Sequence, residues 1–296
     1  MSPVLKNLKR KSAFTIIELL TVMSVIIILI GLLVPALNMV KRVAKKVTQK
    51  NQFHAIEVAM DLFNTEWDQY PPSQCALVPA GDYCGAMKLA EAMMGQDLLG
   101  FHPGSRFRGD GQINDDPTTQ LYPAEADVAP DVYRANLQAR RGPYLPVANA
   151  KAYKLEDLYP ATHLIDLRGD RFVLCDVYAK VTHRTTGQLV GMPVLYYRAN
   201  PSLTGHSAAD AMNNNSIYDY RDNHLLTGLG MPWERPPTSG GPEHDLYSNV
   251  SLFYTMTQDN QITTTVRPVR ADSYILLSAG FDNEYGTPDD IFNFGY

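Results

Sequence analysis

The stretch that decides the fold reads KRKSAFTIIELLTVMSVIIILIGLLVPALNMVKR and covers residues 9–42. Between Lys11 and Lys41 the only charged side chain is that of Glu18. Such a run is long enough to cross a bilayer core of about 30 Å as a single helix. It is too long for the apolar region of a secretory signal peptide and lacks an A-x-A-like exit. A plain single-pass anchor is the other alternative, but it leaves the carboxylate of Glu18 unexplained, because an unpaired charge inside a membrane is costly.

The residues around this carboxylate form a motif. Residues 13–20 read AFTIIELL and follow a short basic leader. This motif resembles the prepilin processing site of the type IV pilin and type II secretion pseudopilin family, although Ala13 stands where that family usually has glycine. The resemblance implies that a prepilin peptidase cuts between Ala13 and Phe14 and methylates the new amino terminus. It also implies that Phe14 and Glu18 act in filament assembly.

The apolar residues around Glu18 give a physical reason for its role in assembly. A carboxylate at Glu18 needs a positive partner there, and the amine of Phe14 in a neighbouring subunit would supply one. The Coulomb attraction grows in a low dielectric, so this pair would fix the axial register of the filament. Pro35 matches a helix-disrupting proline of the family and is expected to kink or loosen the helix near Gly31, because proline removes a backbone hydrogen bond.

Charge divides the chain into a basic arm and an acidic body. Residues 1–50 contain nine Lys and Arg and one acid, a charge of +8, so a net charge of −5 leaves −13 for the remainder. This asymmetry favours a membrane-proximal stem and does not support nucleic acid binding. Basic residues flank the span on both sides, so charge alone does not orient it. The family resemblance implies a single-pass protein of the inner membrane, with a cytoplasmic N-terminus and a periplasmic body. The filament would lie in the periplasm or at the cell surface.

The helix is expected to continue beyond the membrane and to end at Gln69–Pro72, where paired prolines bar further helix. An amphipathic stripe is predicted along it at Val40, Val43, Val47, Ala55, Val58, Ala59, Leu62 and Phe63. The predicted organisation is therefore a leader at 1–13, a transmembrane and spine helix at 14–70, and a globular body at 71–296.

The body is predicted to be α+β, with the long helix packed on a small antiparallel sheet that carries long loop insertions. Strands are expected at 171–181, 193–198 and 273–278, which are rich in β-branched and aromatic residues, and short helices at 85–99 and 131–141. Clusters of Gly, Pro, Asp and Asn mark the loops. Pseudopilin major subunits are generally shorter, so the family does not explain residues 73–170.

The C-terminal stretch SAGFDNEYGTPDDIFNFGY begins at Ser278 and resembles the calcium loop of the major type II secretion pseudopilin, at residues 278–293. The resemblance implies carboxylate ligands from Asp282, Asp289 and Asp290 and carbonyl ligands from Ala279 and Asn293. Calcium takes six to eight oxygen ligands, which side chains and loop carbonyls together can supply. Gly286 is expected to permit the turn. The alternative is a solvated acidic turn.

Other signals are weaker. Residues 109–116 include Asp110, Asp115 and Asp116, but an ordinary polar turn is the favoured interpretation. Cys75 and Cys84 lie close enough in sequence for a disulfide, and three separate thiols are equally consistent with the spacing. The chain lacks the H-E-x-x-H, G-x-S-x-G, Walker and G-x-G-x-x-G motifs. A catalytic role is therefore not expected.

Three functions are compatible with these patterns. The first is a structural subunit of a type II secretion pseudopilus that supports protein export. Its partners would be further copies of the chain, other pseudopilins, the prepilin peptidase and the inner-membrane secretion platform. The second is a type IV pilin for adhesion, motility or DNA uptake. Such pilins usually carry a C-terminal disulfide loop, and no cysteine follows Cys175. The third is a membrane-tethered surface protein or enzyme that uses a pilin-type anchor.

Overall fold

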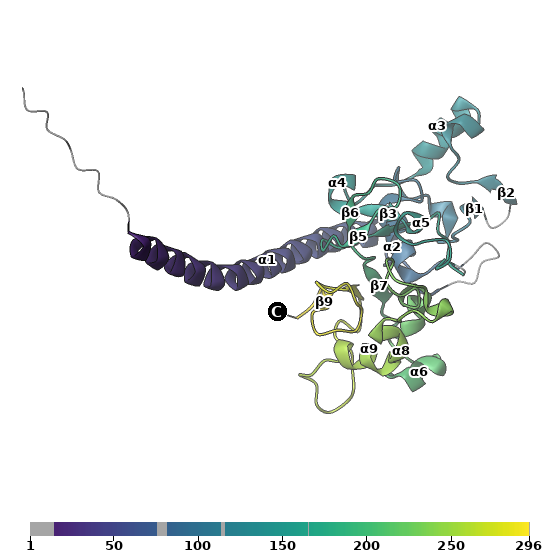
Figure 1. Ribbon diagram of the computed structural model, residues 1–296. Helices are drawn as coiled ribbons and strands as arrows, with labels where there is room; N and C mark the ends of the chain where they lie inside the picture. Colours follow the sequence, from purple (N-terminus) through teal and green to yellow (C-terminus); the bar gives the residue numbers. More distant parts are fainter. Residues whose placement is uncertain (1–14, 76–81, 114–115, 165, 296) are drawn as a thin grey trace, which may run out of the picture. The chain divides into compact units, whose positions relative to one another are not determined.

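The computed structural model describes residues 15–75, 82–113, 116–164 and 166–295 (Figure 1). Both Ala13 and Phe14 of the expected processing site lie outside the described residues. The chain divides into two compact units, 1–44 and 45–296, and the boundary falls inside one long helix.

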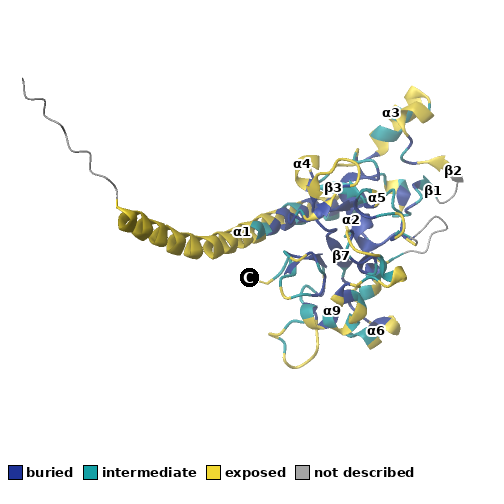
Figure 2. Ribbon diagram, in the orientation of Figure 1, coloured by how far each residue is buried: buried dark blue, intermediate teal, exposed yellow. Residues whose placement is uncertain are grey.

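This helix is α1, Ile16–Trp67, and it continues through Pro35. Within the described residues it is the one helix that is long and apolar enough to cross a membrane. A signal sequence near the N-terminus would meet the same criteria of length and composition. Every residue from 15 to 44 is exposed, as the uniform colour of this part of α1 shows (Figure 2).

The second half of α1 packs into the body along a face that differs from the predicted stripe. Its buried residues are Gln49, Gln52, Phe53, Ile56, Ala59, Met60 and Phe63. Of the predicted stripe, Ala59 and Phe63 are buried and Ala55 is half-buried, whereas Val40, Val43, Val47, Val58 and Leu62 are exposed. The prediction was therefore wrong in phase, because it counted aliphatic residues and passed over the two glutamines.

Both glutamines are buried because loop backbone groups satisfy their amides. Gln52 Nε2 donates to the carbonyl of Cys175 at 2.8 Å, and Gln49 Oε1 accepts from the amide of Val177 at 3.0 Å. A buried amide that is hydrogen-bonded costs little, whereas an unpaired one costs a few kcal/mol. These bonds hold α1 to the body. The helix ends at Trp67, and Asp68 then takes a left-handed φ of 55° before Pro71 and Pro72.

The largest sheet is antiparallel and has the order β7-β8-β9. Strand β7 is Leu195–Arg198, β8 is Tyr274–Ser278 and β9 is Ile291–Phe292. The register pairs Leu195 with Leu277, and Ser278 with Ile291. Strand β8 is buried along its whole length, so the sheet lies in the core. The predictions of strands at 193–198 and 273–278 are confirmed, whereas β9 was not predicted.

Three two-stranded antiparallel sheets complete the described strands. They pair β1 (Gln112–Ile113) with β2 (Asp116–Gln120), β3 (Ala152–Lys154) with β4 (Phe172–Leu174), and β5 (Val181–Thr182) with β6 (Leu189–Val190). The strand predicted at 171–181 is therefore too long. It is interrupted at Asp176, whose Oδ1 accepts from the amides of Tyr178 and Met192 and so turns the chain out of the ladder.

Helix α2, Gly85–Met94, is buried at every position and packs against β4 and β7. Helix α3, Pro130–Ala139, has no buried residue (Figure 2). These two correspond to the helices predicted at 85–99 and 131–141. The shorter helices are α4 (Val147–Ala150), α5 (Leu155–Leu158), α6 (Ala208–Met212), α7 (His224–Thr227), α8 (Asp245–Ser248) and α9 (Val250–Thr257). The fold is mixed α+β with small antiparallel sheets, as expected.

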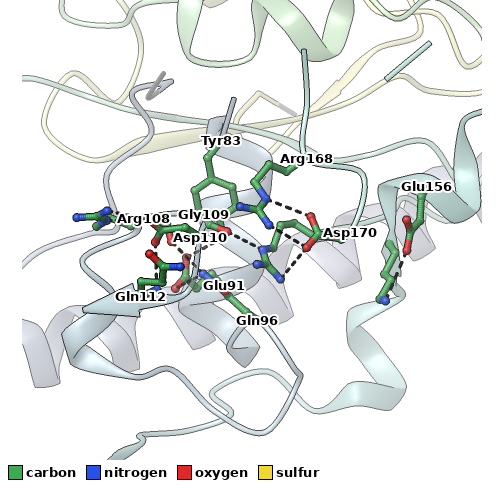
Figure 3. Close-up of polar contacts among 12 residues, drawn as sticks. Tyr83, Glu91, Gln96, Arg108, Gly109, Asp110, Gln112, Glu156, Arg168 and Asp170 are labelled. Atoms are coloured by element: carbon green, nitrogen blue, oxygen red, sulfur yellow. Dashed lines mark hydrogen bonds and ion pairs between the residues drawn. The ribbon is translucent and has the colours of Figure 1, made fainter. Parts of the chain in front are cut away.

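Within residues 73–170, a buried carboxyl group of α2 connects the segments that precede and follow this helix. Glu91 accepts hydrogen bonds from Tyr83 Oη at 2.7 Å and Gln96 Nε2 at 3.1 Å (Figure 3). It also accepts one from Tyr122 Oη at 3.3 Å. Burial raises the pKa of Glu91 and outweighs the opposing effect of these hydrogen bonds. A residue of α2 thus organises part of the segment 73–170, which the family resemblance does not explain.

Candidate functional site

The first site is the start of α1, where Thr15 and Glu18 bond to each other reciprocally. The amide of Thr15 donates to Glu18 Oε2 at 2.8 Å, and the amide of Glu18 donates to Thr15 Oγ1 at 3.3 Å. This is the capping-box arrangement, in which two amide groups without helical partners are satisfied at a helix N-terminus. The hydroxyl of Thr15 also donates to Glu18 Oε2 at 2.7 Å. The carboxylate of Glu18 therefore has partners within its own chain, which sequence reasoning missed although the T-x-x-E spacing signals it.

The second site is the acidic loop between β8 and β9. It begins after Ala279, and the hairpin register of these strands holds its two ends together. Gly286 has a φ of +101°, and a Cβ there would lie 2.6 Å from the amide nitrogen of Leu246. The prediction that Gly286 permits the turn agrees with this geometry.

The loop gathers the three predicted carboxylates, but backbone amides already occupy several of their oxygens. Asp289 Oδ2 accepts from the amides of Phe281 at 2.6 Å and Asp282 at 3.0 Å. Asp282 Oδ1 accepts from the amide of Glu284 at 2.9 Å, and Asp290 Oδ2 accepts from the amide of Gly286 at 2.8 Å. The loop is thus partly stabilised by its own backbone.

The pKa values of these acids separate as expected for carboxyl groups that share a small space. Burial, together with a hydrogen bond to Asp289, raises the pKa of Asp282. Burial opposes ionisation of Asp289 too, but hydrogen bonds from Asp282, from Thr287 and from backbone amides outweigh it and lower its pKa. Burial raises the pKa of Asp290 to about 8, and the neighbouring acids add to the effect.

Several polar atoms in and beside the loop are buried without a hydrogen-bond partner among the described residues. They are Asp290 Oδ1 and both amide atoms of Asn283. Asn283 and His244 are fully buried, and His244 Nδ1 accepts from the amide of Tyr285 at 3.2 Å. Burying an unpaired polar atom is costly, so such atoms indicate a place where a further group can bind. Sequence reasoning did not single out Asn283, because only its burial distinguishes it.

The two residues predicted to supply carbonyl ligands, Ala279 and Asn293, lie at the start of the loop and after β9. Ala279 is fully buried at the start of the loop. Asn293 follows β9, where its Oδ1 accepts from the amide of Leu276 at 2.9 Å and its Nδ2 donates to Glu57 Oε1 at 3.0 Å. Its side chain therefore connects the sheet to α1. In the part of the chain that the structure describes, no group of three or more His, Cys, Asp or Glu is arranged to hold a metal ion.

The second acidic stretch, residues 109–116, has the hydrogen bonds of a polar turn in the part that the structure describes. Asp110 Oδ2 accepts from Arg108 Nη2 at 2.8 Å, and Asp110 Oδ1 accepts from the amide of Gln112 at 3.0 Å (Figure 3). Asp115 lies outside the described residues, and the side chain of Asp116 is not described. The thiols of Cys75, Cys84 and Cys175 are free in the structure. Burial raises the pKa of Cys75 to about 12, with a further contribution from Cys84.

Comparisons of this chain with known protein families, with curated proteins and with solved structures found no match.

Proposed function

We propose that this chain is a structural subunit of the pilin class, most similar to the major pseudopilin of a type II secretion system. In this proposal the peptidase cleaves before Phe14, and the exposed apolar half of α1 anchors the subunit in the inner membrane. The same half then packs against other subunits in a short filament that supports protein export. The body carries no catalytic function.

The observation that carries the proposal is the division of α1 into two halves of different character. Residues 16–40 are mostly apolar and exposed, and Glu18 near the start is their only charged side chain, whereas the half after Gln49 is packed into an α+β body. A solvent-exposed apolar helix of this length requires a membrane or neighbouring helices to cover it. The AFTIIELL motif at its start supports the pilin class over a plain anchor.

The cleavage step is tested by mass spectrometry of the protein isolated from its native membrane. We expect a new amino terminus at methylated Phe14. A protein that keeps Met1 in cells with an active prepilin peptidase would exclude this processing.

The role of Glu18 is tested with substitutions that separate its charge from its capping bonds. Glu18→Gln keeps an acceptor for the Thr15 amide but removes the charge, whereas Thr15→Val removes the hydroxyl and keeps the charge. If the carboxylate pairs with the amine of a neighbouring Phe14, Glu18→Gln abolishes filaments and Thr15→Val assembles. Electron microscopy of sheared cells measures this. Equal assembly of the Glu18→Gln variant and the wild type would show that the charge has no role between subunits.

Calcium belongs to the same proposal, with Asp282, Asp289 and Asp290 as ligands and the carbonyls of Ala279 and Asn293 as further candidates. The partnerless Asp290 Oδ1 and the crowding of three carboxyl groups favour a bound cation. The backbone amides at Asp289 oppose it, because some of those hydrogen bonds must be exchanged for metal contacts. When bound, calcium would neutralise the acids and tie the loop between β8 and β9 to the sheet.

Thermal unfolding of the full chain in detergent tests this binding. A ligand that binds only the native state raises the melting temperature with the logarithm of its excess concentration. We expect this dependence in the wild type, and its loss when Asp289→Ala and Asp290→Ala are combined. Asp259→Asn, in another exposed loop, is the matched control. Identical melting in millimolar calcium and in chelator would leave the loop an ordinary acidic turn.

A further inference from the structure

A polar cavity of about 530 Å³ lies in the body at the end of β7, away from the C-terminal loop. Its wall combines the linker between α1 and α2, the segment after β7 and the turn before α7. Ser73, Arg198, Asn200, Asn214, Asp219 and Asp222 supply its polar groups. The volume lies in the range of sites for small molecules or for the end of a peptide.

The acidic groups of this cavity are already engaged. Asp219 accepts three hydrogen bonds from the side chain of Arg221, between 2.6 and 2.9 Å, and so forms an internal ion pair. Asp222 is only 3% exposed and accepts a hydrogen bond from the hydroxyl of Ser73. Burial raises the pKa of Asp222 to about 7, and Lys88 acts in the opposite direction. Neither acid is therefore available to balance another positive charge.

Arg198 is the cation left without a partner. Its guanidinium makes no hydrogen bond or ion pair with any residue that the structure describes. The side chain is half-buried, and its backbone amide donates to Ser73 Oγ at 2.9 Å, which fixes the position of the residue. An arginine that is partly desolvated and unpaired in a concave site is well placed to bind an external anion, because its planar fork of donors matches a carboxylate.

Two asparagines add donors on the same wall. Asn200 Oδ1 accepts from the amide of Ser202 at 3.2 Å, and Asn214 Oδ1 accepts from Arg221 Nη2 at 2.8 Å. Because each carbonyl oxygen is engaged, the free part of each amide is its NH₂ group, which donates to no residue in the described ranges. The unpaired groups that Arg198, Asn200 and Asn214 present on the cavity wall are therefore hydrogen-bond donors.

We propose that this cavity binds a carboxylate, with Arg198 as the bidentate partner and Asn200 and Asn214 as additional donors. Because Asp219 is paired with Arg221, Arg198 supplies the one uncompensated positive charge of the described cavity wall, which matches a monoanion better than a doubly charged phosphate. The carboxylate can belong to the C-terminus of a peptide or to an acidic side chain. This inference concerns the body alone and does not depend on filament assembly.

Calorimetric titration of the full chain in detergent tests the proposal. The probes are N-acetyl-Gly-Gly, which ends in a carboxylate, its neutral C-terminal amide, N-acetyl-aspartate amide and inorganic phosphate. We expect the first or third probe to bind and the neutral amide not to bind. The better of those two identifies a terminal or a side-chain carboxylate as the ligand.

Substitutions assign the binding to Arg198. We expect Arg198→Gln to weaken it at least tenfold and Arg198→Lys to weaken it less, since a lysine keeps the charge but not the fork. Arg134→Gln, on the exposed helix α3, is the matched control and should leave binding unchanged. Unchanged melting curves verify that the variants are folded. Binding of phosphate in preference to both carboxylates, equal binding by Arg198→Gln, or no binding of either carboxylate would overturn the proposal.

Discussion

The interior carboxyl group of Asp176 makes a sharp prediction about how stability depends on pH. Asp176 is 1% exposed and lies in the loop that bonds to α1. Its Oδ1 accepts from the amides of Tyr178 at 3.0 Å and Met192 at 3.2 Å, and its Oδ2 accepts from Ser278 Oγ at 2.9 Å. Burial nonetheless dominates, and raises the pKa of this carboxyl from 3.8 to about 7.

The sign of the effect follows from this raised value. Between pH 4 and pH 7 the unfolded chain has lost the proton from Asp176 while the native state retains it, so stability falls as the pH rises. The rise of this pKa from 3.8 to about 7 corresponds to about 4 kcal/mol of lost stability, fully expressed above pH 7. Asp176→Asn removes this dependence. Its amide oxygen can keep both backbone hydrogen bonds, and its NH₂ group can donate to Ser278 Oγ.

The assay is thermal unfolding of the full chain and of Asp176→Asn in detergent, followed by circular dichroism from pH 4.5 to pH 8. We expect similar stability at the acidic end and a variant more stable than the wild type at pH 8, by a difference on the order of 10 °C. The other buried acids are common to both proteins, so the difference between the curves isolates Asp176. Parallel curves across this range would refute the reasoning.

Three further predictions concern packing. Phe63→Ala should lower the free energy of unfolding by about 3–5 kcal/mol, because Phe63 is buried in ring contacts with Phe101 and Tyr144. The control is Leu62→Ala at the exposed neighbouring position, which should change the free energy of unfolding by less than about 0.5 kcal/mol. Gly85→Ala should destabilise the body despite the better helix propensity of alanine, because the added Cβ would clash with the carbonyl oxygen of Tyr196. A melting temperature equal to that of the wild type would contradict this close approach. Gln52→Ala should cost about 1–3 kcal/mol by leaving the carbonyl of Cys175 unpaired, with exposed Asn51→Ala as the control, and denaturant titration measures both.

The start of α1 shows how far local patterns extend. The apolar run and the T-x-x-E spacing are contained within a few turns of helix, so the sequence predicts the long helix and, in retrospect, the cap made by Thr15 and Glu18. A partner of Glu18 in the proposed filament would belong to another chain, so no pattern within this chain describes it. The face of α1 that packs was mispredicted for a related reason, since the burial of Gln49 and Gln52 depends on a loop more than a hundred residues away.

The sequence by itself determined the α+β class, the central strands β7 and β8, the helix α2 and the loop that carries Asp282 and Asp289, because each depends on residue spacing or turn chemistry over a short range. Only the tertiary structure decided the pairing of β9, the burial of Asn283 and the unpaired state of Arg198. These depend on which distant segments meet. A backbone register, or a hydrogen bond such as that of Gln52 with the carbonyl of Cys175, forms when packing brings distant segments together, and no local pattern encodes that meeting.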